Sequence, residues 1–134
     1  MFVPMRRNIS VLAVALGALF CQAPALLAHH SNSAFQVDQT IKLQGVVTEF
    51  QWANPHIWIY LSVDDGTGGK VEWHIEGRPP GILGRAGWTR NSLKPGWVVT
   101  ILCNPAKDGS HVAMVERVTL ENGYVLRNEP FNVP

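Results

Sequence analysis

The sequence predicts a small all-β domain, and three observations carry this prediction. Short runs rich in β-branched and aromatic residues recur from Thr40 onward, separated by clusters of glycine, proline, asparagine and aspartate. Two of these runs, His56–Val63 and Lys70–Glu76, alternate apolar and polar side chains, which is typical of strands with one buried face. The chain has 134 residues, which is enough for one domain with one hydrophobic core.

The order of the elements predicts the architecture. A loosely helix-spaced segment, Arg78–Pro95, contains several glycines, so we expect no more than one or two helical turns there. Gly45, inside the first apolar run, indicates a bulge or a sharp bend. The resulting fold is a small OB-like barrel of five to six strands, with a short helical insertion between strands three and four. The expected strands are Ile41–Trp52, His56–Val63, Lys70–Glu76, Trp97–Cys103, His111–Leu120 and Tyr124–Leu126.

The N-terminal segment has the pattern of a secretory signal peptide. Arg6 and Arg7 precede an apolar run, Ile9–Phe20, which is shorter than the roughly 20 residues that a membrane span needs. Small-residue cleavage sites end at Ala25 and at Ala28, and both remain open. We therefore expect a periplasmic or secreted protein with no transmembrane anchor after cleavage. The expected division is a signal peptide at 1–28, an N-terminal arm at 29–40, the β-barrel at 41–127 and a tail at 128–134.

Charge and composition limit the classes of partner. The chain carries 11 basic and 10 acidic residues, and removing the signal peptide with Arg6 and Arg7 leaves a slight acidic excess. A chain of this balance lacks the basic surplus with which proteins bind nucleic acid, so no nucleic-acid partner is expected. The hydrophobic fraction of 46% and the charged fraction of 16% exclude a disordered chain. Cys103 is the single cysteine after cleavage, so an internal disulfide is excluded.

Several short motifs resemble a family of small exported bacterial proteins, the domain of unknown function 6152. The motifs occur in order from His29 to about Leu126. The resemblance implies an exported, β-rich domain with no established activity, and it favours cleavage after Ala28. One departure is Trp97, where the family pattern has an acidic residue. The motifs are His29-His30-Ser31, Asn54-Pro55-His56, Trp73, Gly87-Trp88-Thr89, Lys94-Pro95-Gly96 and Pro105-Ala106-Lys107-Asp108-Gly109.

The histidines define one candidate site. All five lie after the signal peptide, and neutral imidazole is a good ligand for copper or zinc. If His29 becomes the first residue, its amine and its imidazole chelate one metal ion together. His30 and His56 are the further candidate ligands, so a copper-binding protein is the alternative function. No cofactor is firmly predicted. The alternative to a metal site is that these histidines are solvated surface residues without a ligand.

The aromatic residues of the second strand define the other candidate site. Strand alternation places His56, Trp58 and Tyr60 on one face, together with His74 of the next strand. OB-type barrels bind ligands on such a face, so these four residues are the predicted ligand-binding group. The alternative is that the rings pack in the core, as we expect for Trp73. The leading hypothesis is a non-enzymatic module that binds an unknown small molecule or protein partner.

Overall fold

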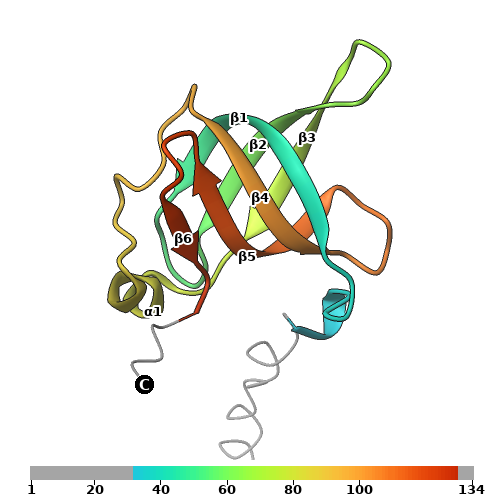
Figure 1. The fold of residues 1–134 in the computed structure, drawn as a ribbon. Coiled ribbons are helices and arrows are strands. Elements are labelled where there is room, and N and C mark those ends of the chain that lie inside the picture. The colour runs from blue at the N-terminus through green and yellow to red at the C-terminus, as the bar shows by residue number, and fades with distance from the viewer. Residues whose placement is uncertain (1–31, 130–134) are drawn as a thin grey trace, which may run out of the picture. The chain divides into compact units, whose positions relative to one another are not determined.

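The computed structural model describes residues 32–129 (Figure 1). Within that range, a short 3-10 turn, η1 (Asn32–Ala34), precedes the barrel, and α1 (Pro80–Leu83) with the 3-10 turn η2 (Gly84–Ala86) separates β3 from β4. The predicted all-β class with a short helical insertion is confirmed. No helix in this part of the chain has the length and apolarity to cross a membrane. The described strands are β1 (Ile41–Gln51), β2 (Trp58–Asp64), β3 (Lys70–Glu76), β4 (Val98–Pro105), β5 (Val112–Leu120) and β6 (Val125–Arg127).

The strand pairing closes the sheet into a barrel. The order is β3-β2-β1-β4-β5-β6, and β3 also pairs with β5 in parallel, so that five strands form a ring and β6 is added to β5. Closure leaves the five barrel strands paired on both sides, which removes most of the free edge of so small a sheet. Figure 1 shows the β2–β3 hairpin projecting beyond the barrel, at the end opposite α1. The predicted OB-like barrel of five to six strands is confirmed.

The barrel interior is filled by the inward faces of the strands and by side chains of the helical insertion. Leu83 of α1 and Trp88, just after η2, are almost completely buried. These two side chains belong to the same apolar cluster as the inward residues of the strands, so the insertion contributes to the core. The fully buried strand residues of that cluster are Val47, Ile59, Leu61, Ile75, Ile101, Cys103, Ala113 and Val118.

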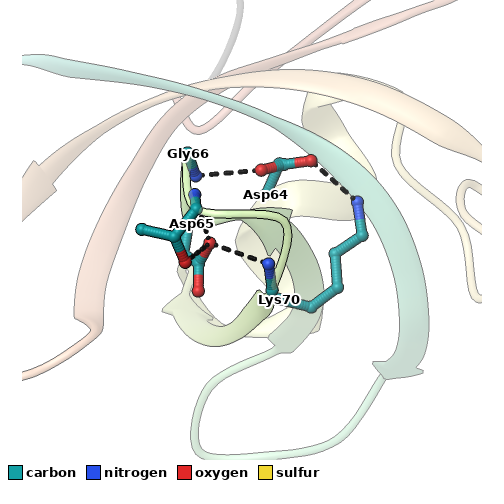
Figure 2. A network of polar contacts seen from close by, with 6 residues as sticks. Asp64, Asp65, Gly66 and Lys70 are labelled. Atoms are coloured by element: carbon teal, nitrogen blue, oxygen red, sulfur yellow. Dashed lines mark hydrogen bonds and ion pairs between the residues drawn. The ribbon is translucent and has the colours of Figure 1, made fainter.

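Carboxylates order the tip of the β2–β3 hairpin (Figure 2). Asp64 Oδ1 accepts a 2.9 Å hydrogen bond from the Gly66 N–H. Asp65 Oδ1 accepts from the Thr67 N–H at 2.8 Å and from the Gly69 N–H at 3.0 Å. In such Asx turns the aspartate carboxylate accepts the backbone N–H groups that have no partner strand within the turn, and this allows the chain to reverse direction. The aspartate-rich composition of this segment therefore sets the register of the hairpin.

The strand limits differ from the predicted ones by one or two residues at most ends. The difference that affects the site is at β2, which begins at Trp58, so His56 precedes the strand and does not belong to it. The peptide bond between Asn54 and Pro55 in this connection is cis. The structure has the predicted turn between β2 and β3. The limits of β3 are also the predicted ones.

Of the two features expected at Gly45, a bulge or a sharp bend, the bulge does not lie at this residue. The register of β1 against β2 shifts between Val47 and Glu49, so the irregularity lies beyond the glycine. Gly45 instead permits close approach of the two strands. A Cβ atom at this position would lie 2.3 Å from the carbonyl oxygen of Ser62, which no side-chain rotation can relieve.

Trp73 is less deeply buried than expected. It is partly buried and packs against the core cluster, and its ring centroid lies 5.0 Å from that of His111. Trp73 pairs with Leu61 near the point where the β2–β3 hairpin leaves the barrel. The strand face was predicted correctly, but the ring borders the core because the barrel wall ends there.

Candidate functional site

The outward face of β2 carries the aromatic side chains of the predicted site. Ile59 and Leu61 point into the barrel and are fully buried, whereas Trp58 and Tyr60 alternate with them and point outward. Both outward rings are half-buried, and neither belongs to the core cluster. Trp52, which follows β1, does pack against that cluster. Trp52 therefore serves the core, whereas Trp58 lies on the outward face of β2.

Tyr60 and His74 lie directly opposite each other on β2 and β3, as the hairpin register predicts. Their ring centroids are 4.7 Å apart and the rings are inclined at 62°, an edge contact. Nε2 of His74 lies 3.0 Å from Oε1 of Glu72 on the same strand. These two contacts hold the imidazole upright on the outward face of the barrel.

His56 reaches the same face through Glu76. Nδ1 of His56 donates to the carboxylate of Glu76, which lies directly opposite Trp58 in the β2–β3 register. The Glu76 side chain is only 13% exposed, so this contact is sheltered from water. Glu76 was not among the predicted site residues. The one available signal was its place on the same strand face as His74.

The neighbouring strand β1 extends this face. Glu49 pairs with Tyr60, and Gln51 pairs with Trp58. Neither was singled out from the sequence, because the bulge before Glu49 decides which β1 residues point outward. We call the whole surface the aromatic face. It consists of His56, Trp58, Tyr60 and His74, flanked by Glu49, Gln51, Glu72 and Glu76.

The aromatic face offers unused hydrogen-bonding groups. Within residues 32–129, neither the indole N–H of Trp58 nor the hydroxyl of Tyr60 has a hydrogen-bond partner. The core tryptophan Trp88 differs, since its indole N–H donates to a backbone carbonyl at 2.8 Å. Buried indole and phenol groups normally find a partner inside the protein. Trp58 and Tyr60 therefore present both a ring and a free polar end to the outside.

The family of the chain follows from comparison with known proteins. The model of the family of unknown function DUF6152 matches residues 16–115. The chain belongs to this family. No curated protein matches it significantly in sequence. Among solved structures, the S. cerevisiae mitochondrial single-stranded DNA binding protein Rim1 is similar, with a TM-score of 0.48 and 13% sequence identity, over 62% of this chain and 94% of that one.

The copper ligands predicted for this DUF6152 chain are not brought together by the described part of the structure. His29 and His30 lie outside the described residues. His56 uses its Nδ1 for Glu76. Across residues 32–129, no group of three or more histidine, cysteine, aspartate or glutamate side chains is close enough to hold a metal ion. The copper site stays a prediction that depends on the N-terminal histidines.

Cys103, the cysteine of the described barrel, is in an environment that makes its thiol unreactive. Cys103 points into the core from β4 and is fully buried. Burial, with a smaller contribution from the charge of Glu116, raises the pKa of its thiol to about 12. The thiol therefore stays protonated at neutral pH and is a poor nucleophile. His111, the residue before β5, packs against Trp73.

Proposed function

We propose that this protein is an exported, non-enzymatic binding module whose aromatic face holds a neutral oligosaccharide. One observation carries the proposal: Trp58 and Tyr60 stand side by side along β2 with their rings outward and their polar ends unpartnered among the described residues. The outward surface of strands two and three is where OB-type barrels bind extended polymers, oligosaccharides among them.

The side chains around the two rings suit the hydroxyl groups of a sugar. Aromatic faces pack against the C–H faces of sugar rings, and they lose little conformational entropy on binding because each ring has only two rotatable bonds. Glu49 has acceptor positions beyond the one taken by the Gln51 amide at 2.8 Å, and Gln51 offers its carbonyl oxygen and its second N–H. This combination of stacking surfaces and polar groups directs a ligand without requiring it to be charged.

The charge of the aromatic face favours a sugar over a nucleic acid. Its flanking positions hold the carboxylates Glu49, Glu72 and Glu76, and the eight residues that define it include no lysine or arginine. A phosphate backbone would meet like charge there and no cationic partner, although phosphate contacts supply most of the affinity in nucleic-acid binding. Export rests on the signal peptide expected at residues 1–28.

The test is an NMR titration of the exported protein with a panel of neutral oligosaccharides. We expect the indole N–H signal of Trp58 to shift in a saturable way with at least one probe. Trp58→Ala and Tyr60→Ala should each weaken binding by about tenfold or more, as expected for aromatic anchors at the centre of a site. Trp97→Ala and Tyr124→Ala are the matched controls, because both rings are exposed elsewhere on the barrel.

Several outcomes would contradict the proposal. One is an absence of shifts at the aromatic face with every saccharide, or a response there to a single-stranded oligonucleotide instead. Another is a loss of folding stability in Trp58→Ala as large as that in Trp88→Ala, since the ring would then serve the core. Shifts induced by a cationic peptide alone would point to a protein partner and likewise exclude the sugar.

A further inference from the structure

A second surface differs from the aromatic face in carrying arginine side chains. It is a groove of about 680 Å³ that lies where β3 leaves β5 and the chain turns toward α1. Val37, Pro79 and Asn128 are among the residues that line it. Six charged side chains line it: Glu76, Arg78, Glu116, Arg117, Arg127 and Glu129.

The strand pairing explains why a groove forms there. β3 pairs with β5 only as far as Met114, and β6 takes over the same edge of β5 from Arg117 onward (Figure 1). Between these two pairings the Asn128 N–H donates to the carbonyl oxygen of Glu116 at 2.9 Å. The Asn128 side chain accepts a 3.0 Å hydrogen bond from the Arg78 N–H. Asn128 thus fixes the backbone of Arg78 beside the end of β6.

Two arginines face each other across this groove wall. Arg117 of β5 lies directly opposite Arg127 of β6. Ladder hydrogen bonds run from Asn128 to Glu116, on the adjacent rung, and from Leu120 to Tyr124, three rungs away on the other side, so the hydrogen-bonded rungs are the ones that alternate with Arg117/Arg127. Arg117 and Arg127 therefore form a non-hydrogen-bonded pair, in which side chains come closest, with Cα atoms about 4.5 Å apart. Like charges directly opposite each other destabilise a sheet.

The three guanidinium groups share the groove with three carboxylates but pair with none of them in the described part of the chain. Across residues 32–129, the side chains of Arg78, Arg117 and Arg127 take part in no ion pair and no hydrogen bond. Each guanidinium presents five N–H donors in a planar fork that fits an oxyanion, and the groove is lined by such donors from three separate segments.

The carboxylates of the groove are already engaged or lie at its end. Glu76 accepts from His56. Glu116 accepts from the Asn104 amide at 2.8 Å and from the hydroxyl of Thr40 at 2.7 Å, and both of these donors lie toward the N-terminal segment. Glu129 is exposed at the limit of the described chain.

We propose that this groove binds an oxyanion, a phosphate or carboxylate group of a small ligand, between Arg117 and Arg127 with Arg78 as a third donor. An anion between the paired arginines turns their mutual repulsion into two charge-assisted contacts. The site is independent of the proposed function, because Arg117 and Arg127 lie on β5 and β6, which carry no residue of the aromatic face. Only the His56–Glu76 pair borders both surfaces.

The test follows the arginine side-chain N–H signals by NMR while inorganic phosphate or citrate is added, with sodium chloride at matched ionic strength as the reference. We expect saturable shifts at Arg117 and Arg127. Arg117→Gln and Arg127→Gln should each weaken binding by about tenfold, since a hydrogen bond to a charged group is worth that much. Arg90→Gln, an exposed arginine outside the groove, and Trp58→Ala should leave binding unchanged.

The sign of the coupling between the two arginines gives an independent readout. In chloride, a double-mutant cycle on stability should show Arg117 and Arg127 to be mutually unfavourable, and in saturating phosphate or citrate the coupling should become favourable. A response to phosphate alone identifies a phosphoryl ligand, and a response to citrate alone identifies a carboxylate. Equal coupling in all three salts, or equal binding by wild type and both glutamine variants, would overturn the proposal.

Discussion

The indole N–H of Trp88 donates a 2.8 Å hydrogen bond to the backbone carbonyl of Arg127. This contact joins the helical insertion to β6, two parts of the chain that pack against different strands of the barrel. Trp88 is 2% exposed, and its ring lies 6.3 Å from that of Phe50 on β1. One side chain therefore connects the insertion, the last strand and the inward face of the longest strand.

Replacement of Trp88 should separate its packing from its hydrogen bond. Trp88→Ala should lower the free energy of unfolding by about 3–5 kcal/mol, the range for a large buried aromatic residue. Trp88→Phe keeps a ring but leaves the Arg127 carbonyl unpaired, so a loss of about 1–3 kcal/mol is expected. Urea unfolding measures both. Trp97→Phe is the control, and a loss equal to that of Trp88→Phe would contradict the assignment.

A methyl group at Gly45 should destabilise the barrel. A Cβ at this position would lie 2.3 Å from the Ser62 carbonyl oxygen and 3.0 Å from Cγ of Leu61, so β1 and β2 must move apart. We expect Gly45→Ala to cost roughly 2–3 kcal/mol, as measured by urea unfolding.

Gly81 provides the matched control for Gly45. It lies in α1, and a Cβ there meets nothing within 4 Å. Gly81→Ala should therefore stabilise the protein by about 0.4–1 kcal/mol, because alanine restricts the unfolded chain without straining the folded one. Equal effects of the two substitutions would show that the close approach at Gly45 has no energetic consequence.

The fold could be predicted largely because its signals are local. Alternation in two adjacent runs and an aspartate-glycine turn fix the β2–β3 register, and this register places Tyr60 opposite His74. The parallel pairing of β3 with β5 has no local signal, and was reached only through the order of the elements. Trp73 was placed on the correct face, but where the barrel wall ends depends on that long-range pairing.

The sites were less predictable because they depend on bulges and on barrel closure. The bulge before Glu49 decides which β1 residues flank Trp58 and Tyr60. The pairing of Arg117 with Arg127 depends in the same way on the register of β6. A register shift of one residue moves every following side chain of a strand to the opposite face. The residue types at the shift do not predict where it occurs.

The pKa of Asp65 should lie below its ordinary value of 3.8. The N–H and the hydroxyl of Thr67 and the N–H of Gly69 all donate to this carboxylate in the hairpin tip (Figure 2). Because the folded-state pKa is lower than the unfolded one, the stabilisation is complete above the unfolded value and is lost as the pH falls through the folded value.

A carboxyl-carbon NMR titration checks this prediction. The midpoint for Asp65 should lie below that of an unstructured aspartate, and protection of the Gly69 N–H from exchange should fall over the same pH range. In Asp65→Asn the amide oxygen still accepts these hydrogen bonds, so the pH dependence of the Gly69 signal should disappear while the turn persists. A midpoint at or above 3.8 would contradict the hydrogen bonding at the hairpin tip.

The thiol of Cys103 should be unreactive in the folded protein. Burial raises its pKa to about 12, so very little thiolate is present at mildly alkaline pH, and the barrel wall blocks access to the sulfur. We expect no reaction with a thiol reagent in native buffer and complete reaction in strong urea, in a Cys21→Ser chain in which Cys103 is the one remaining cysteine. Because the folded-state pKa is the higher one, the thiol contributes stability that is complete below its ordinary value of 9.0 and is lost as the pH rises toward 12. Native labelling as fast as that of an exposed cysteine would show that β4 opens to solvent, and would contradict the packing of the barrel core.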